Sequence, residues 1–315
     1  MAVDLSTRPV RVTRRFRARQ SLQRHWQLYL LMVVPLLFFV VFKYVPMANA
    51  VIAFKDYSVV LGPWGSSWVG WDNFSRMFGN PVFGSLVTNT LQLSGYYLLA
   101  GFPVPLILAL CLNEIRSRFF RRTVQMVTYA PYFISTVVVV SMMMLFFAPR
   151  IGIASRLLEP LGLGGLDVMG SEAAFRHLYV WSDIWQTAGY SAVIYMAALA
   201  GIDPALYDAA KVDGASRLQR IRHVDIPAIL PTCAVVLILG VGNLMAVGFE
   251  KAFLLQNPLN FGSSEIISTY VYKIGLLNAD FGLATAVGLF NAVVNLALLV
   301  VVNAIVKRIG GSSLW

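Results

Sequence analysis

The sequence contains few charged residues. Only 13% of its 315 residues are Asp, Glu, Lys or Arg, and 58% are hydrophobic. A soluble domain has about 25% charged and about 45–50% apolar residues. The shortage of charge therefore excludes a water-soluble globular domain. Long apolar runs such as 28–42, 137–148, 228–241 and 292–305 are present instead, and segments of roughly 20 apolar residues span a bilayer as helices. The sequence predicts an all-α integral membrane protein.

Cysteine and histidine are scarce as well. The two cysteines, Cys111 and Cys233, lie in apolar segments near one side of the membrane. They neither frame a disulfide-stapled outer domain nor make a metal site by themselves, so we expect them to be packing residues. The three histidines, His25, His177 and His223, fall in separate segments on alternate sides, which excludes a shared metal site. No nucleophile lies in a recognisable catalytic setting, and we expect no catalytic residue and no bound metal.

Six apolar segments predict six membrane spans, at about 28–50, 86–112, 123–147, 177–200, 228–249 and 283–306. The basic residues alternate between the connecting segments. Of the 25, 17 lie in the tail 1–27, in 113–122, in 201–227 and in 307–308. Because basic loops stay in the cytoplasm, both termini are predicted to be cytoplasmic. The chain then divides into a basic tail (1–27), a six-helix domain (28–306) and a short tail (307–315).

The N-terminal tail and first apolar run have simple interpretations. The run is longer than the 7–15 residues of a signal-peptide core and lacks a small-residue cleavage site, so we expect a retained helix. The basic tail is expected to set topology beside anionic lipid. Since the composition places the chain in a bilayer, the +10 net charge does not indicate nucleic-acid binding. The outer loops 51–85, 148–176 and 250–282 are rich in Gly, Pro and aromatics, which predicts interfacial anchors and lids rather than domains.

The cytoplasmic loop 201–227 carries unusually complete helix signals. Asp203 is a good N-cap, Pro204 suits the first helical position, and Gly214 can adopt the left-handed conformation that ends a helix. These signals predict a helix over 204–213. A second helix is predicted to begin at once, because Ser216 and Gln219 have the spacing of a capping box, and to run at the cytoplasmic surface until the fifth span starts at Pro227.

The first of these two helices has small or apolar residues on part of its surface: Leu206, Ala209, Ala210 and Val212. Small side chains let a helix approach another surface closely, as an amphipathic helix does when it binds in a groove. An amphipathic linker lying on its own membrane domain has the same pattern. The spacing alone leaves both interpretations open.

The same loop resembles a known motif. Asp208-Ala209-Ala210, three residues, Gly214, nine residues and then 224–227 is similar to EAA-x3-G-x9-I-x-L-P of the permease subunits of binding-protein-dependent ABC importers, with Asp208 in place of Glu. The stretches 26–54, 110–116, 128–135, 248–258 and 312–315 resemble the polysaccharide-type branch of carbohydrate importers. Within that branch the chain resembles most the first permease subunit of alginate-oligosaccharide importers. Relatives that handle other plant or algal oligosaccharides share most of these stretches.

The resemblance implies a six-helix permease of the type I, maltose-transporter-like fold in a bacterial inner membrane. It implies a heterodimer with a second permease subunit, two ATPase subunits and a periplasmic solute-binding protein that delivers an oligosaccharide. The ATPase subunits would bind ATP and Mg²⁺, since this chain has no G-x4-G-K-[ST] phosphate loop and is not expected to be an enzyme. The helix at 204–213 would couple to an ATPase through Tyr207, Asp208, Ala209, Ala210, Asp213 and Gly214. Alternating access would then move the sugar inward.

A solute path requires polar or aromatic residues inside spans, because such groups seldom face lipid. Seven candidates meet this condition: Trp185, Gln186, Tyr190, Asn243, Glu250, Asn291 and Asn295. Aromatic faces suit sugar rings, and amides suit hydroxyls. Each candidate also has a structural interpretation, since amides bond neighbouring helices and Trp anchors at interfaces. Asp183, close to the first three in sequence, has the alternative of an ion pair with a nearby base.

Two other classes of function were weighed. An ion-coupled secondary transporter or a channel would favour an inverted repeat or charges clustered at the bilayer midplane, and the sequence shows neither. An integral membrane enzyme would need a catalytic constellation, for which no residues are evident. The permease of an ATP-driven oligosaccharide importer is therefore the predicted function, with alginate or a similar acidic polysaccharide fragment as the predicted substrate.

Overall fold

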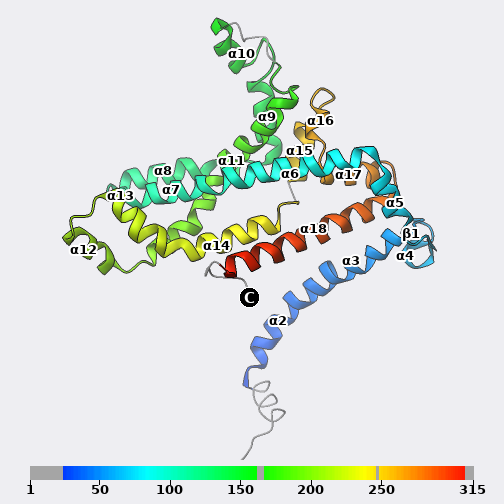
Figure 1. The fold of residues 1–315 in the computed structure, drawn as a ribbon, viewed down its shortest axis with the longest axis horizontal. Helices are drawn as coiled ribbons and strands as arrows, with labels where there is room; N and C mark the ends of the chain where they lie inside the picture. Colours follow the sequence, from blue (N-terminus) through cyan, green and yellow to red (C-terminus); the bar gives the residue numbers. More distant parts are fainter. Residues whose placement is uncertain (1–23, 162–166, 246–247, 309–315) are drawn as a thin grey trace, which may run out of the picture.

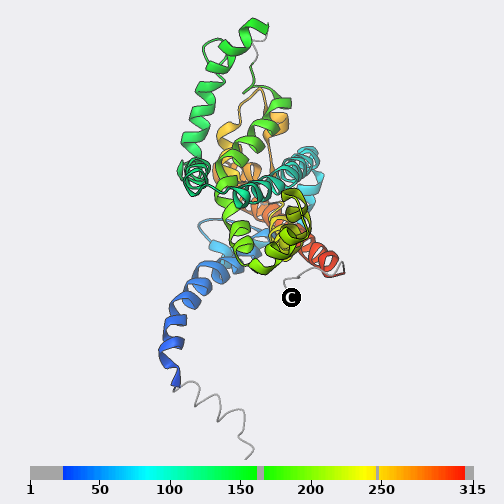
Figure 2. The ribbon, with the colours of Figure 1, turned by 90° about the vertical axis from the view of Figure 1, so that its left-hand side faces the viewer.

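The computed structural model describes residues 24–161, 167–245 and 248–308. Its first element is an unbroken helix, Trp26–Phe54, made of α2 (Trp26–Phe39), a π-helical turn η1 (Val40–Tyr44), α3 (Val45–Ala48) and a 3₁₀ segment η2 (Asn49–Phe54). It is apolar and almost wholly exposed from Trp26 to Asn49. Both views show α2 leading away from the other helices (Figures 1 and 2). The N-terminal tail of the sequence prediction lies largely outside the described residues.

The long helices form a bundle along the horizontal axis of Figure 1. They are α6 (Pro81–Gly101) with α7 (Pro103–Glu114), α11 (Glu172–Ala200), α14 (Ile226–Gly242) and α18 (Phe281–Arg308). The short helices α12 (Pro204–Val212) and α13 (Arg217–Arg220) lie at one end, and β1, α4 and α5 lie at the other (Figure 1). The predicted topology places the loop 201–227, which contains α12, and the segment 307–308 in the cytoplasm. The α12 end of the bundle is therefore its predicted cytoplasmic end.

The end opposite α12 contains a small hairpin that the sequence did not reveal. β1 (Lys55–Asp56) pairs antiparallel with β2 (Ser67–Trp68), and α4 (Gly62–Gly65) lies in the connection. α5 (Asp72–Gly79) follows, and its Asn73 amide donates to the backbone oxygens of Ala53 and Lys55. The hairpin is thereby fixed to the end of the first helix. Trp64, Trp68 and Trp71 are exposed, as expected of interfacial anchors.

The predicted third span, 123–147, is not one straight helix. α8 (Arg118–Tyr129) continues into a 3₁₀ turn, η3 (Ala130–Phe133), and α9 (Thr136–Phe146) then leaves at 98°. Pro131 has no N–H to continue the α-helical ladder, and the Ser135 hydroxyl accepts from Val138 N and caps a new helix. α9 consequently projects out of the bundle (Figures 1 and 2), followed by α10 (Ile153–Leu158) and η4 (Glu159–Leu161).

The predicted fifth span, 228–249, is shifted. The helix runs from Arg217 to Gly242 and includes the π-helical η5 (Ile221–Asp225) between α13 and α14. It ends near Asn243, after two glycines of low helix propensity. Glu250, which the predicted span places just beyond its outer end, lies with Lys251 on a separate helix, α15 (Phe249–Leu255). α16 (Phe261–Ser264), α17 (Ile267–Tyr272) and η6 (Lys273–Leu277) complete this segment before α18.

Four helices within the described residues have the length and apolarity of membrane spans: Trp26–Phe54, Pro81–Glu114, Arg217–Gly242 and Phe281–Arg308. Two bent pairs raise the number to as many as six, namely α8 through η3 with α9, and α11 with α12 at 74°. The predicted six spans correspond to this upper number. α11 starts five residues before the predicted 177 because the Ser171 side chain caps it at Ala174 N.

In the part of the chain that the structure describes, three groups of buried apolar side chains hold the bundle together. The group nearest α12 joins α7, α11 and α14 around Tyr195, Leu199, Ile229 and Cys233. Cys233 is therefore a packing residue, as predicted. The same prediction is wrong for Cys111, whose side chain is exposed. Its position in an apolar run did not reveal that this face of α7 is left uncovered.

Candidate functional site

The predicted helix in the loop 201–227 is confirmed as α12, Pro204–Val212. The Asp203 carboxylate caps it by accepting from Ala205 N at 2.9 Å. Gly214 has a φ of +73°, Ala215 N donates to Ala210 O, and Gly214 N donates to Lys211 O. This pair of bonds is a Schellman motif, which favours glycine at the left-handed position. The sharp end of α12 thus follows from Gly214.

The second predicted helix is confirmed as well. The Ser216 hydroxyl and the Gln219 side chain form the expected capping box. The helix then widens into η5, where Ile226 N donates to Ile221 O, five residues back. Pro227 follows immediately and has no N–H of its own to donate. The π-helical turn brings Asp225, the last residue of η5, into the buried region between the loop and the bundle.

The coupling residues predicted on α12 fall into two groups. Tyr207 and Ala210 are half-buried against the protein, whereas Asp208, Ala209, Asp213 and Gly214 are exposed. The exposed Asp208 pairs with Lys211 at 2.8 Å. Leu206 and Val212 are also exposed, at 52% and 88%. Apolar side chains left uncovered on this short amphipathic helix favour a protein partner over a helix that lies entirely on its own membrane domain.

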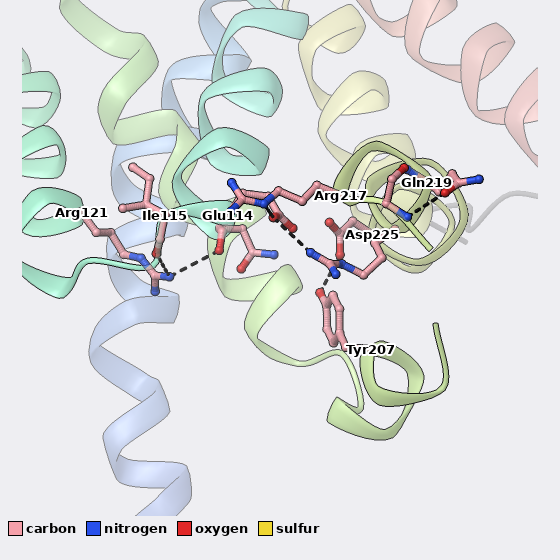
Figure 3. Close-up of polar contacts among 10 residues, drawn as sticks. Glu114, Ile115, Arg121, Tyr207, Arg217, Gln219 and Asp225 are labelled. Carbon is pink, nitrogen blue, oxygen red and sulfur yellow. Dashed lines mark hydrogen bonds and ion pairs between the residues drawn. The ribbon is translucent and has the colours of Figure 1, made fainter. Parts of the chain in front are cut away.

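Polar contacts fix α12 to η5 and α13 to the end of α7 (Figure 3). The Tyr207 hydroxyl donates to Asp225 Oδ1 at 2.6 Å, and Asp225 is fully buried. Burial, with the Asp225 carboxylate as hydrogen-bond acceptor, raises the pKa of Tyr207 to about 12. Glu114 at the end of α7 lies 3.5 Å from Arg220 and 3.9 Å from Arg217.

Arg121 of α8 extends the same network. It donates to the backbone oxygens of Asn113 and Ile115, which lie at the end of α7. Asp225 and Glu114 lie in the segments 224–227 and 110–116 that carry the resemblance, but neither was predicted as a site residue. Each is an acidic residue at the cytoplasmic limit of an apolar run, and that was the available signal.

A pocket of about 580 Å³ lies between α6–α7, α11 and α14. Tyr190, a predicted path residue, lines it together with Tyr97, Thr187, Ser191 and Tyr195. The Tyr190 ring also stacks on Tyr132, with centroids 4.0 Å apart. Aromatic rings beside hydroxyls are a combination suited to a sugar.

A second pocket, of about 700 Å³, lies between α9 and α11 and is lined by Trp185, also a predicted path residue. Trp181 and His177 line it too. Trp181 Nε1 donates to the Tyr96 hydroxyl at 2.7 Å, and that hydroxyl lies 2.9 Å from His177 Nδ1. Because Trp185 and Tyr190 line different pockets, the structure does not bring these two candidates together.

Gln186, another predicted path residue, forms hydrogen bonds within the protein. It is buried, its amide donates to Ile134 O at 2.7 Å, and its oxygen accepts from Lys251 Nζ at 3.1 Å. The same Lys251 ammonium lies 2.7 Å from Asp183 Oδ1. The ion-pair alternative for Asp183 is thereby confirmed.

The remaining path candidates are dispersed. Asn243 is exposed and donates to Leu239 O, Glu250 is exposed, and Asn295 accepts from Met245 N at 2.9 Å. Asn291 has a buried side-chain oxygen without a hydrogen-bond partner in the described structure. Within residues 24–161, 167–245 and 248–308, no three His, Cys, Asp or Glu side chains are grouped to hold a metal ion.

Comparison with known proteins identifies the family of this chain. The family model described as binding-protein-dependent transport system inner membrane component matches residues 101–311, which include the loop 201–227. The chain belongs to this family. It is thus a membrane permease of an ABC transport system, and the resemblance inferred from the loop motif is confirmed.

Two proteins of Bacillus subtilis (strain 168) are similar over nearly their full length. Protein LplB is 41% identical over 94% of this chain and 93% of its own, and the polygalacturonan/rhamnogalacturonan transport system permease protein YteP is 42% identical over 91% and 90%. Among solved structures, a bacterial ABC transporter involved in the import of the acidic polysaccharide alginate contains a chain 38% identical, with a TM-score of 0.85 over 93% of this permease and 99% of that chain. The same kind of transporter in complex with an alginate pentasaccharide-bound periplasmic protein gives a TM-score of 0.86. The predicted ABC permease fold is therefore confirmed.

Proposed function

We propose that this permease is one of two membrane subunits of an ATP-driven importer for acidic oligosaccharides, with alginate fragments as the favoured substrate. The similarity to the alginate transporter chain, 38% identity at a TM-score of 0.85 over 93% of this permease, carries the proposal. YteP is named for polygalacturonan and rhamnogalacturonan, and both polymers, like alginate, contain uronic acids. The shared feature is a sugar chain that carries carboxylates.

The same comparison supports a proposal for the partners. One matching transporter was solved with a periplasmic protein that holds an alginate pentasaccharide, which supports delivery of the sugar to this permease by a binding protein. We propose a heterodimer with a second permease and two separate ATPase subunits that bind ATP and Mg²⁺. In the proposed topology both termini are cytoplasmic, so α12 and α13 face the ATPase subunits.

The coupling role is assigned to α12. Its exposed residues Asp208, Ala209, Asp213 and Gly214, with Leu206 and Val212, would dock in a groove of an ATPase subunit. Tyr207 and Ala210 face the permease itself. ATP-driven closure of the ATPase pair would displace α12 and with it the attached spans, which is the movement that alternating access requires.

For the sugar, the pocket of about 580 Å³ beside Tyr190 is the favoured part of the path. It combines hydroxyls and rings along the helix that continues directly into α12. Gln186 and Asn295 hold neighbouring segments through their hydrogen bonds, so we assign them to the architecture of the path rather than to sugar contact. Asn243, Glu250 and Asn291 stay predictions for contact, whereas Trp185 lines the pocket that this proposal does not favour.

The proposed function is tested by ATP hydrolysis of the complex of this permease with the subunits encoded beside it, reconstituted in lipid with its binding protein. Oligosaccharides of alginate, of polygalacturonan and of a neutral glucan are compared at equal concentration. Stimulation by the uronate oligosaccharides alone supports the proposal. Stimulation by the neutral glucan alone contradicts the substrate class, and absence of any co-purifying ATPase contradicts the coupling.

A further inference from the structure

The contact between Tyr207 and Asp225 provides a specific mechanical link inside the permease. All nine residues of α12 are described, and none is fully buried. α12 meets α11 at an angle of 74°, through the short connection 201–203. A helix held by so little packing needs a directional contact if its movement is to reach the bundle.

The hydrogen bond from Tyr207 is such a contact. Its length of 2.6 Å is typical of a hydroxyl that donates to a carboxylate, which is among the stronger hydrogen bonds in proteins. Asp225 is fully buried, and its other oxygen, Oδ2, has no hydrogen-bond partner among the described residues. A buried carboxylate with few partners is costly, so the Tyr207 hydroxyl is strongly held where it is.

The position of Asp225 makes the contact mechanical. Asp225 is the last residue of η5, and α14 begins at the next residue. A displacement of Tyr207 therefore acts directly on the start of the fifth span. The π-helical geometry at this point is itself a local departure from the regular helix, of the kind often found at functional sites.

A second connection joins the same segment to α7. Glu114 lies between Arg217 and Arg220 of α13, one of which, Arg220, is largely buried. The two connections leave α12 linked to α14 through Tyr207, and α13 linked to α7 through Glu114 (Figure 3). The loop is thus joined to the inner ends of two spans by one hydrogen bond and by ion pairs.

We propose that Tyr207 is a positioning residue for transport, which transmits the displacement of α12 to the fifth span through its hydrogen bond to Asp225. This inference rests on the proposed function, because it assumes that an ATPase displaces α12. It adds that the exposed face of α12 receives the movement and the Tyr207 face passes it on.

The test uses the full complex in proteoliposomes and measures ATP hydrolysed per sugar imported, for wild type and Tyr207→Phe. Removal of the hydroxyl is expected to raise this ratio several-fold. Tyr44→Phe is the matched control, since it removes the same group from the exposed first helix and should leave the ratio unchanged. An unaltered ratio in an assembled Tyr207→Phe complex overturns the inference.

A second pair of variants covers the case in which Tyr207→Phe does not assemble. Asp225→Asn keeps an acceptor oxygen for the hydroxyl, and Asp225→Leu removes it. The inference requires a near-normal ratio for Asn and a raised ratio for Leu; equal ratios overturn it. If wild type itself shows no ATP-driven import, the proposed function fails and this inference fails with it, whereas normal wild-type import with an unaltered Tyr207→Phe ratio contradicts the inference alone.

Discussion

Lys251 of α15 and Asp183 of α11 form an ion pair of 2.7 Å across 68 positions of sequence. Lys251 is 3% exposed, and it also donates to Gln186. Gln186 in turn donates to Ile134, next to the break between η3 and α9. One lysine therefore fixes the short helix α15 to the long helix α11 and, through Gln186, to the bent third span.

Removal of Lys251 should destabilise the permease. In Lys251→Met, Asp183 keeps its charge without a partner, and loss of one member of a buried pair costs about 3–5 kcal/mol. Partial exposure of Asp183 places the expected loss toward the lower end. The melting temperature of the purified complex measures it. The double variant Lys251→Met/Asp183→Leu should regain most of the loss, and a double variant as unstable as the single one would argue against the ion pair as the cause.

Gly189 should not tolerate a side chain. A Cβ at this position would overlap the backbone oxygen of Thr128 in α8, so the close approach of α11 and α8 depends on glycine. Gly189→Ala should cost about 1–3 kcal/mol through overpacking. Gly84→Ala on α6 is the matched control, because its Cβ would meet no atom within 4 Å. Equal thermal stability of the two variants would show that the helices can separate without penalty.

The effect of a substitution at Gly214 should depend on how readily the new residue adopts a positive φ, and not on the size of its side chain. A Cβ at this position has open space around it, but the φ of +73° disfavours a β-branched residue by about 1–2 kcal/mol. Gly214→Val should reduce co-purification of the ATPase subunit, whereas Gly214→Asn, which adopts this conformation more readily, should retain it. Equal retention of the ATPase by both variants would indicate that the end of α12 is not used in docking.

Variants of Tyr190 and Trp185 can show which of the two pockets belongs to the sugar path. If the pocket of about 580 Å³ holds the sugar, Tyr190→Ala should lower the apparent affinity for oligosaccharide by about five-fold, corresponding to about 1 kcal/mol for a lost ring contact. Trp185→Ala in the other pocket should have little effect. The concentration of oligosaccharide that gives half-maximal ATPase stimulation is the measurement. The reverse order would assign the path to the pocket between α9 and α11.

Tyr207 should ionise at a higher pH than an ordinary tyrosine. Its pKa is raised to about 12, above the usual value of about 10. Because the folded state favours the protonated form, the associated stability is fully present below pH 10 and is lost as the pH rises toward 12. The difference in phenolate absorbance between wild type and Tyr207→Phe, followed against pH, isolates this group. A difference curve with its midpoint near pH 10 would contradict a strong hydrogen bond to Asp225.

Local signals predicted the loop because they act over few residues. Asp203, Pro204 and Gly214 set both ends of α12, and Ser216 with Gln219 sets the start of the next helix, without help from tertiary contacts. Apolar runs likewise located the long helices. The break at Pro131 was missed because hydropathy does not register a lost backbone N–H.

The contacts that hold the site together were harder to foresee. Tyr207 and Asp225 are 18 residues apart, and Lys251 and Asp183 are 68 apart, so only the packing of helices brings them into contact. Polar residues inside spans pointed to a path, but their type alone did not separate Tyr190, which lines a pocket, from Gln186, which bonds its neighbours. That distinction depends on which side of α11 lines the pocket and which side packs against neighbouring helices.

The central claim is that this permease serves ATP-driven import of an acidic oligosaccharide, and uptake by proteoliposomes tests it most directly. Vesicles containing the whole complex are given labelled alginate oligosaccharide with its binding protein, with ATP on the ATPase side or with an imposed ion gradient instead. Uptake that requires ATP and persists when ionophores abolish ion gradients is the predicted result. Uptake driven by the gradient without ATP would contradict the account and support an ion-coupled transporter.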